Sequence, residues 1–156
     1  MRLRTLLLPL LFALLLATSL QAQTRSLAVI SHDGAQKALS LGLAAARQGG
    51  WNMSIAIVDP AGDLIAFARL DGASPASITN ALGKARTAAR FRHATEGIDS
   101  AVVTRPVLMT FEGLTAVGGG VPVTLDGVIV GAIGVSGGSP TQDAAVAREA
   151  GRAIAP

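Results

Sequence analysis

The 156-residue chain contains no cysteine and no tyrosine. The absence of cysteine excludes disulfide bonds, thiolate-bound zinc, iron–sulfur clusters and a catalytic thiol. Aromatic residues make up only 3% of the chain, which disfavours a single-stranded nucleic-acid binder, because such proteins stack bases on aromatic side chains. Charged residues are also few, at 15%, whereas half of the residues are hydrophobic. This composition excludes a disordered chain and is typical of one globular domain.

The first 22 residues have the layout of a secretory signal peptide. Arg2 and Arg4 give a positive start, residues 6–16 are almost wholly apolar, and a run of small and polar residues ends at Ala22. The apolar run is shorter than the about 20 residues that a membrane-spanning helix needs. We therefore expect this leader to be cleaved. A single domain over residues 23–156 would then work in the periplasm or outside the cell, with no membrane anchor.

Cleavage also removes most of the net positive charge. Without Arg2 and Arg4, 11 of the 13 Lys and Arg residues remain, against 10 Asp and Glu residues. A nearly neutral chain with no recognition motif predicts no nucleic-acid partner.

Apolar periodicity in the mature chain predicts a mixed order of helices and strands. Helices are expected over residues 32–47, 75–92 and 140–153, and strands over residues 53–58, 64–70, 121–125 and 128–135. The predicted N-caps are Ser31, Ser74 and Ser139.

Turn residues between the predicted strands indicate hairpins. Asp59-Pro60-Ala61-Gly62 and Asp126-Gly127 have turn composition, so the sheet is predicted to be largely antiparallel. Gly131 and Gly134 would leave room for close packing on the last strand. Residues 94–113 give the weakest pattern and predict a short helix plus a loop.

Three blocks of sequence carry a family resemblance. They are IAIVDPAGDLIAFARLDGA at 55–73, KARTAARFR at 84–92 with Ser77-Ile78 before it, and a glycine-rich block at 119–143 that contains GGVPV, DG and GAIGVSGG. In this order and spacing they resemble the GlcG/HbpS-type haem-binding family, which also includes the C-terminal domain of some adenosyltransferases. The resemblance covers nearly the whole mature chain.

The resemblance implies an α/β (α+β) fold of the profilin-like type, with an antiparallel five-stranded sheet flanked by helices. It further implies homo-oligomers, octamers among them, and haem as a ligand, with iron release from haem proposed for the family. The axial ligand of the iron is not part of the shared signature. Its identity must therefore be sought among the residues of this chain.

The strong iron donors that the mature chain contains are His32, His93, Met53 and Met109, because haem proteins use His, Met, Cys or Tyr. Both methionines are expected in the core. His32 opens a helix and His93 ends one, where a surface role or an interaction with the helix dipole is the alternative. His32 and His93 are the predicted metal donors. Their separation of 61 positions does not make a zinc motif.

Weaker oxygen donors, admitted by the family resemblance, are Thr87 and Thr104.

A basic window without acidic residues runs from Gly72 to Thr95. Arg86 and Arg90 share a helix face, whereas Lys84 points roughly the opposite way. These three cations are predicted to bind haem propionates or another carboxylate through charge-assisted hydrogen bonds. The alternative is that the arginines pair with Asp or Glu of this chain or of a neighbouring subunit.

Two functions follow from these observations. The first is an exported haem- or tetrapyrrole-binding protein, a binding protein more than a true enzyme, with slow haem-degrading or iron-releasing activity. The second is an oligomeric accessory protein that binds a small organic acid or a periplasmic dehydrogenase and no haem. A spectrum recorded after adding hemin distinguishes them.

Overall fold

The computed structural model describes residues 26–154, so the predicted leader and its cleavage site lie outside the described residues. The elements, in chain order, are α2 (His32–Gln48), β1 (Ser54–Val58), β2 (Leu64–Arg69), α3 (Ala76–Phe91), α4 (Thr95–Thr104), the 3-10 helix η2 (Pro106–Thr110), β3 (Gly120–Leu125), β4 (Val128–Ser136) and α5 (Pro140–Gly151). The predicted helices and strands are confirmed, with ends shifted by one or two residues.

The four strands form one antiparallel sheet in the order β2-β1-β4-β3. The α+β class is confirmed, but the expected fifth strand is not found in the part of the chain that the structure describes. The extended segment before α2 runs beside the first half of β4. There it makes a single backbone bond, from the Ile30 amide to the Val130 carbonyl (2.9 Å), too little pairing to count as a strand.

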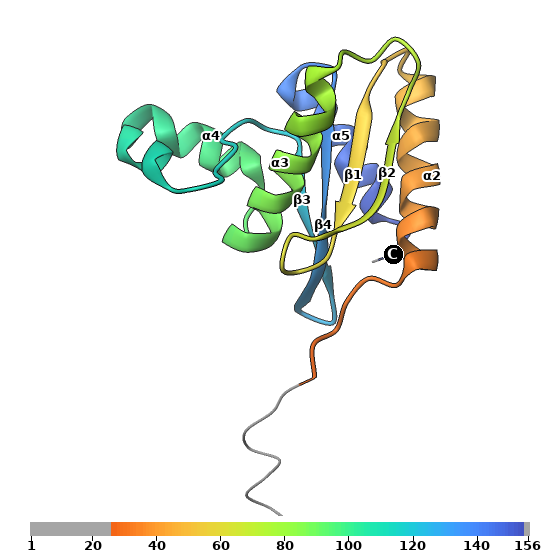
Figure 1. Cartoon of the computed structure of the whole chain (residues 1–156), viewed down its shortest axis with the longest axis horizontal. Coiled ribbons are helices and arrows are strands. Elements are labelled where there is room, and N and C mark those ends of the chain that lie inside the picture. Colours follow the sequence, from red (N-terminus) through yellow and green to blue (C-terminus); the bar gives the residue numbers. More distant parts are fainter. Residues whose placement is uncertain (1–25, 155–156) are drawn as a thin grey trace, which may run out of the picture.

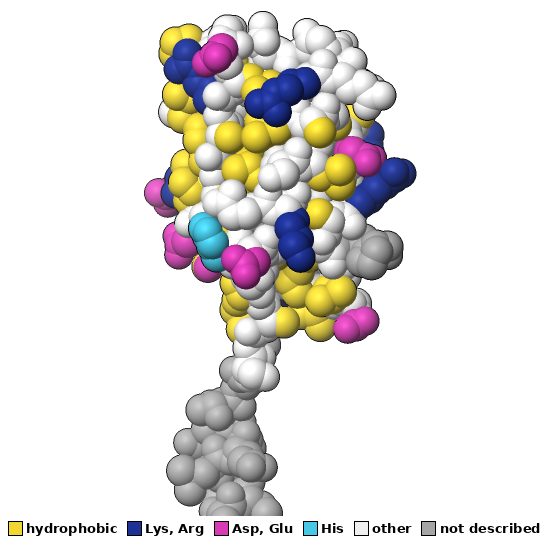
Figure 2. Space-filling view, turned by 90° about the vertical axis from the view of Figure 1, so that its right-hand side faces the viewer, with side chains coloured by type: hydrophobic (Ala, Val, Ile, Leu, Met, Phe, Trp, Pro, Cys, Tyr) yellow, Lys and Arg dark blue, Asp and Glu magenta, His cyan; other side chains and the backbone are white. Residues whose placement is uncertain are grey.

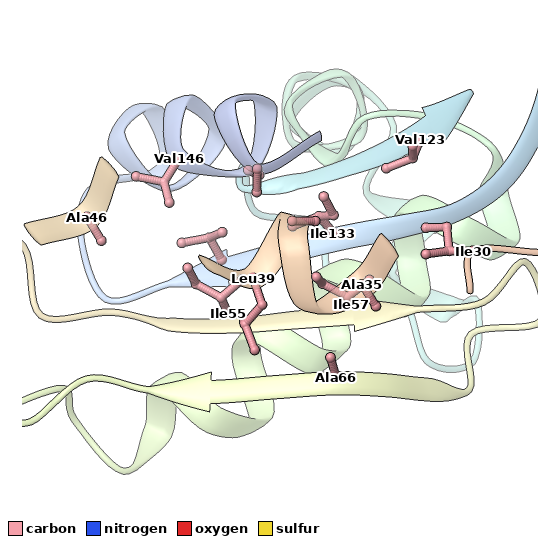
Figure 3. Packing of buried hydrophobic residues seen from close by; sticks show 14 of the residues in the cluster. Ile30, Ala35, Leu39, Ala46, Ile55, Ile57, Ala66, Val123, Ile133 and Val146 are labelled. Carbon is pink, nitrogen blue, oxygen red and sulfur yellow. The ribbon is translucent and has the colours of Figure 1, made fainter. Parts of the chain in front are cut away.

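Helices cover both faces of the sheet (Figure 1). Successive strand side chains point to opposite faces, so Ile55 and Ile57 pack with residues of α2 and α5, whereas Ala56 and Val58 pack against α3. Figure 3 shows Leu39 of α2 among the isoleucines of the strands. The core is therefore two apolar layers, one on each side of the sheet.

Glycine at position 134 sets how closely α3 approaches the sheet. A Cβ added to Gly134 would lie 2.1 Å from the Ala81 carbonyl oxygen, a distance that no side chain tolerates. The close packing predicted for this glycine is confirmed. The predicted β3–β4 hairpin is also confirmed, and both of its turn residues, Asp126 (φ 50) and Gly127 (φ 77), have the positive φ that two-residue turns favour.

The helix starts agree with two of the three predicted caps. The hydroxyls of Ser31 and Ser139 accept hydrogen bonds from Gly34 N (3.1 Å) and Gln142 N (3.3 Å). The prediction for Ser74 was wrong: Pro75 is the cap residue of α3 and no side chain caps this helix.

The segment that was hardest to predict contains α4 and η2. It forms an arm that projects away from the sheet beside the end of α3 (Figure 1). The expected short helix with a loop is confirmed in outline. None of the helices in residues 26–154 is long and apolar enough to cross a membrane.

Candidate functional site

An apolar hollow of about 240 Å³ lies between the end of α3, α4 and η2. Its walls come from one stretch of chain: Phe91, His93, Gly97, Ile98, Ala101, Leu108, Phe111 and Leu114. The rings of Phe91 and Phe111 stack at a centroid distance of 6.0 Å, yet both side chains remain exposed. The hollow therefore offers a flat aromatic and aliphatic surface that is open to solvent on one side.

His93 is the one titratable side chain in the lining of this hollow. Arg92 ends α3 in the left-handed region (φ 55), which turns the chain before His93. The imidazole then packs beside the first turn of α4, where its Nε2 is 3.1 Å from the point that a Cβ on Gly97 would occupy. A neutral imidazole is a common metal ligand. The structure thus brings one of the two predicted donors to an apolar surface.

Arg86 and Arg90 hold the turn between β1 and β2. Their Nε atoms donate to the carbonyl oxygens of Gly62 (3.1 Å) and Ala61 (2.9 Å), respectively. Among residues 26–154 no carboxylate lies within 4.0 Å of either guanidinium. The predicted alternative, pairing with acids of this chain, is therefore not observed there; the partners are backbone carbonyls instead.

Lys84 is placed elsewhere. Its ammonium is buried and lies 2.7 Å from Asp143 Oδ2 of α5, and the other carboxylate oxygen accepts from Gly138 N (2.9 Å). Burial raises the pKa of Asp143 above its ordinary value, against the opposing effect of the Lys84 hydrogen bond. The structure does not bring Lys84 to the hollow.

The two predicted threonines have local partners. Thr87 is buried; its hydroxyl accepts from Thr115 N (2.9 Å) and donates to Gly113 O (3.4 Å). It thereby fixes the segment that follows Phe111 against α3. Thr104 is exposed at the end of α4 and donates to Ala101 O (3.2 Å).

The other predicted donors lie outside the hollow. His32 is exposed at the first turn of α2, in the helical layer on the opposite face of the sheet from α3. Met53 is buried in the core as expected. Met109 was expected in the core but is 56% exposed on η2, because η2 lies on the projecting arm. Within the described residues no group of three His, Asp or Glu side chains could hold a metal ion.

The apolar lining of the hollow was missed by the sequence analysis. Ile98 and Ala101 are three residues apart and share a face of α4, and this spacing was the available signal. The glycine and proline residues around α4 obscured it.

The side of the molecule that α2 covers has a different character. Figure 2 shows cationic and acidic side chains scattered over this side among apolar and uncharged ones, several of them beside a side chain of opposite charge. This side presents no patch of one charge.

Comparison with known proteins gives a consistent result. Residues 30–152 match the family model described as "Haem degrading protein HbpS-like". The chain is 38% identical over 109 residues to Protein GlcG of Escherichia coli K12. The aligned residues cover 69% of this chain and 81% of that protein.

Solved structures agree with this match. A double mutant of Streptomyces reticuli HbpS superposes with a TM-score of 0.81 at 30% identity, covering 86% of this chain and 92% of that one. A structure described as a PduOC:heme complex has a TM-score of 0.74 at 27% identity, covering 81% and 95%.

Proposed function

The chain belongs to the HbpS-like family, and on this basis we propose that it is an exported haem-binding protein that holds the macrocycle at the hollow between α3, α4 and η2. The observation that carries the proposal is the position of His93, an imidazole in the wall of an otherwise apolar hollow. The neighbouring structure in complex with haem supports the ligand class.

The residues at the hollow fit a haem group. The macrocycle needs an apolar surface, which the stacked pair Phe91 and Phe111 and the aliphatic lining supply. The iron needs a donor such as His93. His32 lies on the other helical layer, is not part of this lining and serves as the comparison residue.

The size of the hollow bears on assembly. Pockets that enclose a drug-sized ligand have volumes of about 300–1,000 Å³, so a hollow of about 240 Å³ encloses only part of a macrocycle. Val103, Val107 and Met109 are more than half exposed on the same arm. We propose that a homo-oligomer, such as an octamer, covers this arm and the rest of the haem.

Bound haem would supply redox chemistry at its iron, and the family description names haem degradation. We propose that degradation or iron release by this chain is slow. His93 is the one acid–base group in the lining, so the wall of the hollow offers no second group to move a proton. The protein is accordingly a haem binder first.

The test is a titration with hemin followed by absorption spectroscopy. Wild-type protein is expected to sharpen and shift the Soret band. His93→Ala should change the band position, whereas His32→Ala should leave it unchanged. A wild-type protein that leaves the hemin spectrum unchanged would contradict haem binding. If only His32→Ala changes the position of the band, His32 on α2 is the iron ligand instead of His93.

A non-haem accessory protein that binds a small organic acid is the second candidate. The observation that favours it is the pair Arg86 and Arg90, which carry no carboxylate partner among the described residues. A wild-type protein that leaves the hemin spectrum unchanged but binds an organic acid would support this function.

Export is tested separately. The mature protein should begin near Gln23 in an osmotic-shock fraction, as read by N-terminal sequencing. An intact Met1 in the cytosol would contradict it.

A further inference from the structure

The side chains of Arg86 and Arg90 are held in place before any ligand arrives. Each Nε donates to a carbonyl of the β1–β2 turn, at Gly62 and Ala61. Gly62 has φ +94, and a Cβ there would lie 2.9 Å from Arg90 Nε and 3.3 Å from Arg86 Cγ. The positive φ favours glycine at this position, and both arginine side chains pack closely against it.

The bonds to the turn use only one N–H of each guanidinium. A guanidinium has five N–H donors and no acceptor, so the Nη groups of both residues keep their donors. Residues 26–154 supply no carboxylate within 4.0 Å to neutralise them. Arg86 is also half-buried, and a charge near the protein interior is less screened by water than an exposed one. The two guanidinium groups therefore have no carboxylate partner among the described residues.

The location of Arg90 connects the pair to the hollow. Arg90 Nη1 is 4.0 Å from the point that a Cβ on Gly113 would occupy. Gly113 lies between Phe111 and Leu114, which both line the hollow, and Thr87 fixes this segment on α3. The free end of Arg90 is therefore at the rim of the apolar surface.

We propose that Arg86 and Arg90, here called the arginine clamp, form a preformed carboxylate-binding site. Guanidinium groups bind carboxylates through paired charge-assisted hydrogen bonds, and the fixed Nε contacts reduce the side-chain entropy lost on binding. The carboxylate has two possible sources: a haem propionate, which rests on the function proposed above, or a small free dicarboxylate. The two sources are separated by experiment.

The experiment compares hemin with hemin dimethyl ester, in which the propionates are esterified. Both are titrated into full-length mature wild type, Arg86→Gln/Arg90→Gln and the control Arg47→Gln on α2. Succinate is titrated into the same three proteins by calorimetry. Circular dichroism confirms that the variants are folded, and the comparison of hemin with its ester in wild type needs no variant.

If the clamp binds propionates, wild type and Arg47→Gln should bind hemin about ten- to a hundredfold more tightly than the ester. The double variant should lose this preference while its affinity for the ester stays the same. If the source is a free acid, succinate should bind wild type and not the double variant. That outcome supports the clamp even when no Soret shift occurs and haem binding itself has failed. Equal affinity of wild type for hemin and the ester, together with no succinate binding, overturns the proposal.

Discussion

Lys84 of α3 and Asp143 of α5 form a buried ion pair, with Nζ and Oδ2 2.7 Å apart, that joins the helices on opposite faces of the sheet. The pair passes beside Gly119, where a Cβ would lie 2.7 Å from Asp143 Cβ and 3.1 Å from Lys84 Nζ. Gly119, which precedes β3, therefore leaves room for the ion pair that links the two helical layers.

Breaking this pair should destabilise the protein strongly. Lys84→Met or Asp143→Leu alone leaves an unpaired buried charge, which costs about 3–5 kcal/mol of unfolding free energy. The double variant Lys84→Met/Asp143→Leu should be far less destabilised, because no charge remains buried. Urea denaturation measures all three. If the double variant loses as much unfolding free energy as the two single variants together, this account is contradicted.

The raised pKa of Asp143 predicts a specific pH dependence. In the unfolded state the carboxyl of Asp143 has its ordinary pKa of 3.8. In the folded state its pKa is higher, so the folded protein keeps this proton to a higher pH. Stability from this site is therefore present below pH 3.8 and is lost as the pH rises through the raised pKa. The free energy of unfolding of wild type minus that of Asp143→Asn should fall as pH rises through this window. A difference that grows with pH would show that pairing with Lys84 outweighs burial.

Filling the hollow should block haem binding without unfolding the protein. Ala101→Trp places a large side chain in the lining. The Soret shift on adding hemin should be lost, or the affinity for hemin should fall about tenfold. Ala44→Trp, on the exposed face of α2, is the matched control and should bind as wild type does. Equal binding by both variants would place haem elsewhere.

The contact between α3 and β4 predicts a steric effect at one glycine. Gly134→Ala pushes a methyl group into the Ala81 carbonyl and should cost about 1–3 kcal/mol, as overpacking usually does. Gly151→Ala meets nothing within 4 Å and should be close to neutral. Thermal melting compares the two, and equal melting temperatures would contradict the close approach.

The elements of the sheet could be predicted because their sequence signals are local. Asp126-Gly127 indicates the hairpin by itself, and the run of apolar residues rich in Ile and Val that forms β1 needs no distant residue to be recognised. The prediction of a fifth strand came from the family resemblance. In the described residues the segment before α2 instead makes one backbone hydrogen bond to β4, from Ile30.

The site could be predicted only in part. Sequence placed His93 and Arg90 near the end of α3, but it could not show that Arg92 would turn the chain in the left-handed conformation and bring His93 beside α4. It also could not show which acid would pair with Lys84, because Asp143 is 59 positions away. Long-range pairing depends on the packed fold, which local patterns do not encode.

The hollow is built almost entirely by the chain between the end of α3 and Leu114. This arm leaves and rejoins the domain near one place, and two side chains of its first turn tie it to the domain. Thr95 Oγ1 accepts from Gly120 N at the start of β3 (2.8 Å), and Glu96 accepts from Arg148 of α5 (2.7 Å). Natural variation that keeps these two contacts can therefore remodel ligand choice here at little cost to folding. When residues 93–114 are exchanged between relatives that both have Thr95 and Glu96, ligand preference should follow the donor of the arm, whereas thermal stability should follow the recipient domain.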